Sequence, residues 1–151
     1  MAFRYALQTL LRLREGLERQ EEQRLFAAAA VVNALRLQLE RFQESELLYE
    51  RAAQQELCAG SSAALLRFAD VCKAASLQVR KDLESRLAEA DRKRMERLQD
   101  YQAARQKREI LEGLRQKQET AYRFESARQE QQAADEAFLI RGPARTADAE
   151  H

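Results

Sequence analysis

The sequence predicts an all-α protein, with two long helices in an antiparallel coiled-coil hairpin and the second helix longer than the first. Composition is the first observation: of 151 residues, one is Pro, four are Gly and none is Trp. Gln, Glu, Arg, Ala and Leu, all good helix formers, dominate the rest. The second is that apolar residues recur at alternating steps of four and three, as in a coiled-coil seam. The third is a single turn signal at residues 57–62.

The turn signal combines a helix-ending glycine with helix-starting serines. Gly60 is the only glycine between Gly16 and Gly113, so it alone in this region adopts a left-handed backbone without strain. Ser61 and Ser62 follow it, and serine accepts hydrogen bonds from the free N–H groups of a helix start. We therefore expect one helix over residues 4–57, a turn over 58–61 and a second helix over 62–141.

The first helix has a seam of apolar residues, weak where residues 18–24 are all charged or Gln. The returning seam steps through Leu25, Ala28, Val32, Leu35, Leu39, Phe42, Glu46 and Tyr49. In the second helix the same steps run through Leu65, Phe68 or Ala69, Cys72, Ser76, Val79, Leu83, Leu87 and Ala90. Gly142 and Pro143 are stop signals, which predict a flexible tail over residues 142–151.

The off-centre turn makes the two arms unequal. The first arm should end opposite about residue 115, which leaves residues 116–141 of the second helix unpaired. At roughly 1.5 Å per residue this overhang is close to 40 Å long. It bears Tyr122, Phe124, Phe138 and Leu139, and an unpaired helix with such residues should seek a partner. Residues 1–141 are expected to form one domain.

Charge and cysteine usage limit the classes of function. Net charge is +1, but residues 92–108 hold seven Lys or Arg against Glu96 and Asp100. This basic excess fits either a solvated helix face or a site for an acidic partner or phosphates. Cys58 and Cys72 should lie about 15 Å apart, too far for a disulfide. Free thiols fit a reducing cytoplasm, and no stretch is apolar enough to span a membrane.

No motif in the sequence carries chemistry. The single histidine, His151, is the last residue, and no Cys/His cluster has metal-ligand spacing. No glycine-rich phosphate loop is present, and a two-helix seam leaves no pocket for a catalytic triad. We therefore expect no enzyme activity, no metal and no cofactor.

Three stretches together resemble the flagellar export protein FliJ family. The opening residues 3–15 (FRYALQTLLRLRE) are similar to that family's opening motif. The Ala59-Gly60 turn falls at the family's position. The family's C-terminal motif is similar to residues 108–115 (REILEGLR), which are followed by Tyr122 and a charged run to Glu136.

The resemblance implies a non-enzymatic component of the flagellar type III protein export apparatus. Such a stalk would insert both termini into the ring of the export ATPase FliI, promote its assembly, engage the export gate protein FlhA and help recycle export chaperones. It implies a location in the cytoplasm, peripheral at the inner face of the cell membrane through these partners, and a monomeric hairpin.

The resemblance also implies site residues. Positions matching the gate-binding surface are Gln38, Phe42, Ser45, Tyr49, Cys72, Ser76, Val79 and Leu83. Those assigned to the ATPase end are Leu7, Leu11, Arg14, Arg108, Leu111, Arg115 and Tyr122. Phe42, Tyr49, Val79 and Leu83 fit equally well as plain seam residues.

The sequence also fits three other hypotheses. The chain fits the equivalent stalk of a virulence type III secretion system, or a structural dimer in which two chains bury each other's seams. Residues 92–108 could also bind nucleic acid, which would weaken steeply with salt. Tyr101 is the only aromatic residue there to stack on a base, which disfavours that reading.

Overall fold

In the part of the chain that the structure describes, two helices are joined by a short turn. The computed structural model describes residues 2–60 and 62–147, with side chains described as far as residue 142. Helix α1 spans Gln8–Cys58 and helix α2 spans Ala63–Ala147. Within the described residues there is no strand, and α2 is the longer helix, so the predicted fold class is confirmed.

The chain divides into two compact units. One, here called the hairpin unit, comprises residues 17–104. The other, the terminal unit, brings together residues 1–16 and 105–151.

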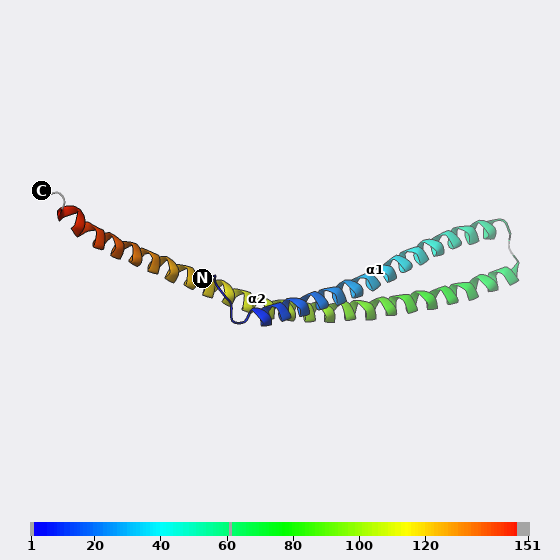
Figure 1. Ribbon diagram of the computed structural model, residues 1–151. Coiled ribbons are helices and arrows are strands. Elements are labelled where there is room, and N and C mark those ends of the chain that lie inside the picture. Colours follow the sequence, from blue (N-terminus) through cyan, green and yellow to red (C-terminus); the bar gives the residue numbers. More distant parts are fainter. Residues whose placement is uncertain (1, 61, 148–151) are drawn as a thin grey trace. The chain divides into compact units, whose positions relative to one another are not determined.

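In the hairpin unit, α1 and α2 run side by side in opposite directions from the turn (Figure 1). The turn depends on Gly60, whose φ of +91° lies in the left-handed region that side chains rarely adopt. Ser62 then caps α2, because its Oγ accepts a hydrogen bond from the Leu65 N–H at 3.4 Å. The left-handed Gly60 and the serine cap both agree with the turn that the sequence predicts.

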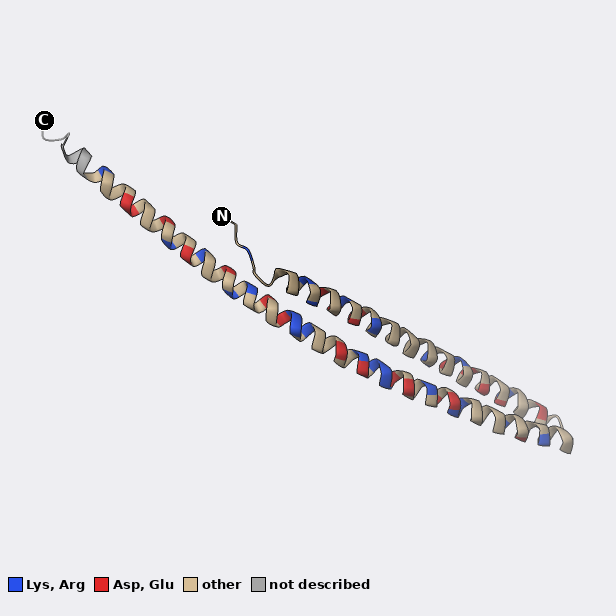
Figure 2. Ribbon diagram, turned by 60° about the horizontal axis from the view of Figure 1, so that its bottom comes forward, with Lys and Arg blue, Asp and Glu red and all other residues tan. Residues whose placement is uncertain are grey.

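The core of the hairpin unit is a thin seam. Val32 is 1% exposed and Ala90 is also buried, while most other apolar side chains of the unit are half-buried or exposed. Charged residues of both signs are interspersed along both helices (Figure 2). Stability of this unit therefore depends on a narrow line of contacts between the helices and not on a thick interior.

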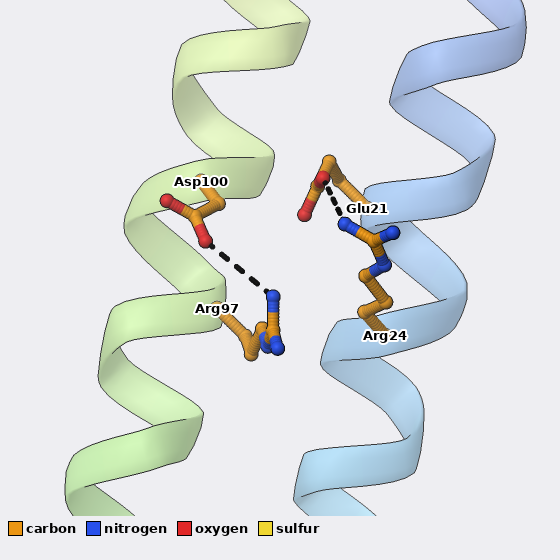
Figure 3. A network of polar contacts seen from close by, with 4 residues as sticks. All are labelled: Glu21, Arg24, Arg97 and Asp100. Carbon is orange, nitrogen blue, oxygen red and sulfur yellow. Dashed lines mark hydrogen bonds and ion pairs between the residues drawn. The ribbon is translucent and has the colours of Figure 1, made fainter.

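A polar layer interrupts this seam where the sequence is most polar. Arg24 pairs with Glu21 at 2.9 Å on α1, and Arg97 pairs with Asp100 at 3.7 Å on α2. Figure 3 shows the two pairs facing one another across the gap between the helices. The Oε2 atom of Glu21 is inaccessible to solvent and has no hydrogen-bond partner. Burying a polar atom in this way costs stability, so the layer is a soft point in the seam.

The terminal unit is held by a non-helical N-terminal segment, residues 2–7, that lies against α2 and ends in a turn at residues 6–7. The Tyr5 hydroxyl donates a buried hydrogen bond to the Leu111 carbonyl oxygen at 3.1 Å. Tyr5, Leu11 and Leu111 form a buried cluster with Phe3 packed against it. Phe3 also contacts Tyr122, with ring centroids 5.6 Å apart. The first helix therefore begins at Gln8 and not at residue 4, because these contacts hold Phe3 and Tyr5 against α2 outside the helix.

This segment shortens the unpaired part of α2. The N-terminal segment contacts α2 as far as Tyr122, whereas the sequence predicts that α2 is unpaired from residue 116. Beyond it, every residue from 127 to 141 is exposed.

The end of α2 also differs from the expectation. The helix continues to Ala147, past Gly142 and Pro143 and past the expected end at residue 141. Proline removes one N–H donor from a helix but does not bar it, and the following residues 144–147 include good helix formers. Residues 142–147 of the expected tail are thus helical, and residues 148–151, including His151, lie outside the described residues.

Candidate interaction surfaces

A groove in the hairpin unit unites half of the residues assigned to the gate-binding surface. Its volume is about 550 Å³, and residues of both helices line it. The lining residues are Phe42, Ser45, Glu46, Tyr49, Glu50, Lys73, Ser76 and Leu77. Four of the eight predicted positions, Phe42, Ser45, Tyr49 and Ser76, are among them.

Cys72 joins this group through Tyr49. Hydrogen bonding with the Cys72 thiol raises the pKa of the Tyr49 phenol above its ordinary value of 10.0, with electrostatic interaction with Cys72 as a further cause. The two residues therefore face one another between the helices. Gln38, Val79 and Leu83 are not among the lining residues; Gln38 and Val79 are exposed and Leu83 is half-buried.

The groove is bordered by an ion pair that the sequence analysis did not single out. Arg80 on α2 donates from Nη2 to Glu46 Oε2 on α1 at 2.6 Å, and the Glu46 side chain is 19% exposed. Glu46 occupies a position in the heptad seam, where an acid is out of place unless a base lies opposite. An acidic residue at a seam position, Glu46, could therefore have predicted an ion pair between the two helices.

A second, smaller groove lies beside the turn. Its volume is about 180 Å³, and mostly apolar residues line it. They are Tyr49, Ala52, Ala53, Glu56, Leu57, Leu65, Leu66, Phe68 and Ala69. Tyr49 lines both grooves, so apolar and polar surface meet at this residue.

The residues assigned to the ATPase end all lie in the terminal unit. Leu11 and Leu111 are buried, with Leu11 at 0% exposure, so they stabilise the unit and do not face a partner. Leu7 and Tyr122 are exposed, while Arg14, Arg108 and Arg115 are half-buried. The accessible part of this set therefore consists of Leu7, Tyr122 and the partly exposed arginines. Phe3 and Tyr5 hold the unit together but were not predicted as functional residues. The sequence feature that could have pointed to them is the presence of two aromatic residues shortly before a helix.

The basic excess over residues 92–108 is largely neutralised by nearby carboxylates. Arg92 pairs with Glu89 at 2.7 Å and Arg94 with Asp91 at 3.0 Å. Arg105 pairs with Glu109 at 2.9 Å. Each pair joins residues three or four apart on one helix, which is ordinary surface pairing. This arrangement favours a solvated helix face over a phosphate-binding site.

The described part of the chain has neither a candidate metal cluster nor a helix that could span a membrane. Within it, no group of three or more His, Cys, Asp or Glu side chains could hold a metal ion. No helix in the same residues is long and apolar enough to cross a membrane. Both cysteines are free thiols, Cys58 exposed and Cys72 partly buried.

Comparison with models of known protein families shows which family the chain belongs to. The family model described as flagellar FliJ protein matches residues 3–146. The chain belongs to the FliJ family. It is thus a flagellar export-associated protein, and this family is a non-catalytic component of the type III export apparatus. No curated protein matches the chain. No solved structure matches it either.

Proposed function

We propose that this FliJ-family chain is the stalk of the flagellar export ATPase. The terminal unit inserts into the ring of FliI and promotes its assembly, and the hairpin unit engages the export gate protein FlhA. The protein also helps recycle export chaperones. The chain itself performs no chemistry, because ATP is hydrolysed by the ring, and it lies at the inner face of the cell membrane only through these partners.

The observation that carries this proposal is the clamped terminal unit. Tyr5 and Phe3 fasten the first residues of the chain to α2 across Leu111 and Tyr122. A narrow two-stranded helical rod stiffened in this way suits insertion into the central opening of a ring. Half-buried Arg14, Arg108 and Arg115 supply positive charge to such a rod, which suits an acidic ring interior.

Stimulation of ATP hydrolysis tests the ATPase contact. Adding the full chain at equimolar amounts to FliI should raise its hydrolysis rate and the fraction of hexamer. The variant Arg108→Glu/Arg115→Glu should lose most of the stimulation, whereas Arg36→Glu, an exposed arginine of the hairpin unit, should keep it. Equal stimulation by both variants would reject the assignment of these arginines, and no stimulation by the unaltered chain would reject the proposed function.

The gate contact is tested separately. The groove at Phe42, Ser45, Tyr49 and Ser76 offers apolar surface with a polar border, the composition that suits a transient protein contact. Phe42→Ala/Tyr49→Ala should weaken binding to the FlhA cytoplasmic domain at least tenfold, since buried aromatic anchors cost about 1.4 kcal/mol or more when truncated. Leu48→Ala, which removes a 65% exposed side chain outside the groove, is the matched control. Equal affinity for all three proteins would exclude this groove.

A further inference from the structure

The exposed end of α2 carries an apolar stripe on a face of its own. Phe124 and Phe138 are 72% and 75% exposed. The stripe steps by three and four along the helix, the spacing of a coiled-coil seam. Its apolar members are Phe124, Ala127, Ala134 and Phe138, with Gln131 in the middle of the stripe and Arg141 at its end. At about 100° per residue, Phe124 points roughly opposite to Leu111 and Tyr122, the side that the N-terminal segment covers. The chain's own first residues therefore leave this stripe open.

We propose that this stripe is a self-association surface, on which residues 124–141 pair in antiparallel orientation with the same residues of a second copy. The segment complements itself in size and charge in one register. In that register Ala127 lies opposite the partner's Phe138, so a small side chain meets a large one. Gln131 lies opposite the partner's Ala134, and Arg141 lies over the ring of the partner's Phe124, where a cation is attracted.

The charges beside the stripe select the same register. Arg128 then lies next to the partner's Asp135, and the twofold symmetry repeats this attractive pair. Arg128 is exposed and no ion pair engages it in the described residues, and Asp135 accepts only one hydrogen bond, from the Gln131 amide at 3.0 Å. Both groups are therefore available to a second copy.

The neighbouring arrangements bring like charges together. Sliding the antiparallel pair by seven residues places Arg128 against the partner's Arg128, or Asp135 against the partner's Asp135. A parallel pair places Arg123 beside the partner's Arg128 and Glu130 beside the partner's Asp135, which repel. The charge pattern thus opposes these alternatives and supports the proposed one.

Sedimentation equilibrium of the full chain tests the pairing. The average mass should rise from one chain toward two as concentration increases from about 10 to 500 µM, since so short a seam binds weakly. Arg128→Asp and Asp135→Arg should each raise the dissociation constant roughly five- to tenfold, because two attractive pairs become repulsive. The double variant Arg128→Asp/Asp135→Arg should restore it. Arg36→Asp, the same charge change in the hairpin unit, should have no effect. A monomer at all concentrations, or no rescue in the double variant, would overturn the proposal.

Disulfide trapping tests the orientation independently. In a Cys58→Ser/Cys72→Ser background, Ala127→Cys and Phe138→Cys chains are mixed and oxidised. The antiparallel register predicts mostly mixed 127–138 disulfides. A majority of 127–127 and 138–138 disulfides would show a parallel pair and refute the register.

Discussion

Replacing Tyr5 with Phe removes one hydrogen bond from the terminal unit and leaves the aromatic ring in place. Tyr5 is 7% exposed, and its hydroxyl donates to the Leu111 carbonyl oxygen at 3.1 Å. A buried hydrogen bond contributes about 0.5–1.5 kcal/mol net. Leu111 lies inside α2, where its carbonyl oxygen also accepts the helical bond, so the lower half of that range applies. Tyr5→Ala removes the ring as well, which costs about 3 kcal/mol or more in a buried site.

Amide hydrogen exchange on the full chain measures these costs locally. The Gln8 N–H donates to the Tyr5 carbonyl oxygen at 3.1 Å, and the Leu11 N–H to that of Leu7 at 2.9 Å. Protection of these amides should fall about two- to fivefold in Tyr5→Phe, since 1.4 kcal/mol corresponds to tenfold, and about a hundredfold in Tyr5→Ala. Amides around Val32 in the hairpin unit report whether the change is local, and Leu13→Ala, at a 57% exposed position, is the matched control. Unchanged protection in both Tyr5 variants would show that the N-terminal segment is not clamped.

Three further predictions concern the hairpin unit. Gly60→Val should destabilise it by about 1–2 kcal/mol in urea unfolding, because a φ of +91° strains any β-branched residue although space beside the Cβ is open; an unchanged midpoint would contradict a left-handed turn. In a double-mutant cycle, Glu46→Gln and Arg80→Gln should show a coupling of about 0.5–1.5 kcal/mol, since the pair is only partly buried, and zero coupling would contradict the ion pair. Cys72→Ala should lower the pKa of Tyr49 toward 10.0 in an ultraviolet titration, and a pKa that stays raised would contradict the thiol contact. Because the folded protein holds this proton more tightly, Tyr49 contributes stability below pH 10 that is lost as pH rises above it.

The fold was predictable because the signals for it are local. Helix-forming composition and the three-four spacing define two helices, and a left-handed position with no competing glycine nearby defines where they turn. Gly60 and Ser62 each act within a few residues of themselves, so no knowledge of the partner helix was needed to place them.

The element ends and the clamp were less predictable because they depend on distant contacts. The sequence pattern predicts that Tyr5 is part of the first helix. In the structure Tyr5 lies outside the helix because its hydroxyl donates to the carbonyl oxygen of Leu111, 106 positions away. The sequence assigns Leu11 to the surface that contacts the ATPase. In the structure Leu11 is buried in a cluster with Tyr5 and Leu111. Glu46 has the spacing of a seam residue but not the apolar character. The ion pair with Arg80 on the other helix explains why an acidic residue is present there.

The central claim is that the terminal unit acts on the export ATPase as one clamped rod, and ATP hydrolysis by FliI tests it most directly. Hydrolysis is measured with the unaltered chain, with Tyr5→Ala and with Phe42→Ala/Tyr49→Ala, which changes only the hairpin groove. We predict stimulation by the unaltered chain and the groove variant, and weak stimulation by Tyr5→Ala because its rod is unclamped. Full stimulation by Tyr5→Ala, once hydrogen exchange confirms that its N-terminal segment is open, would contradict the account.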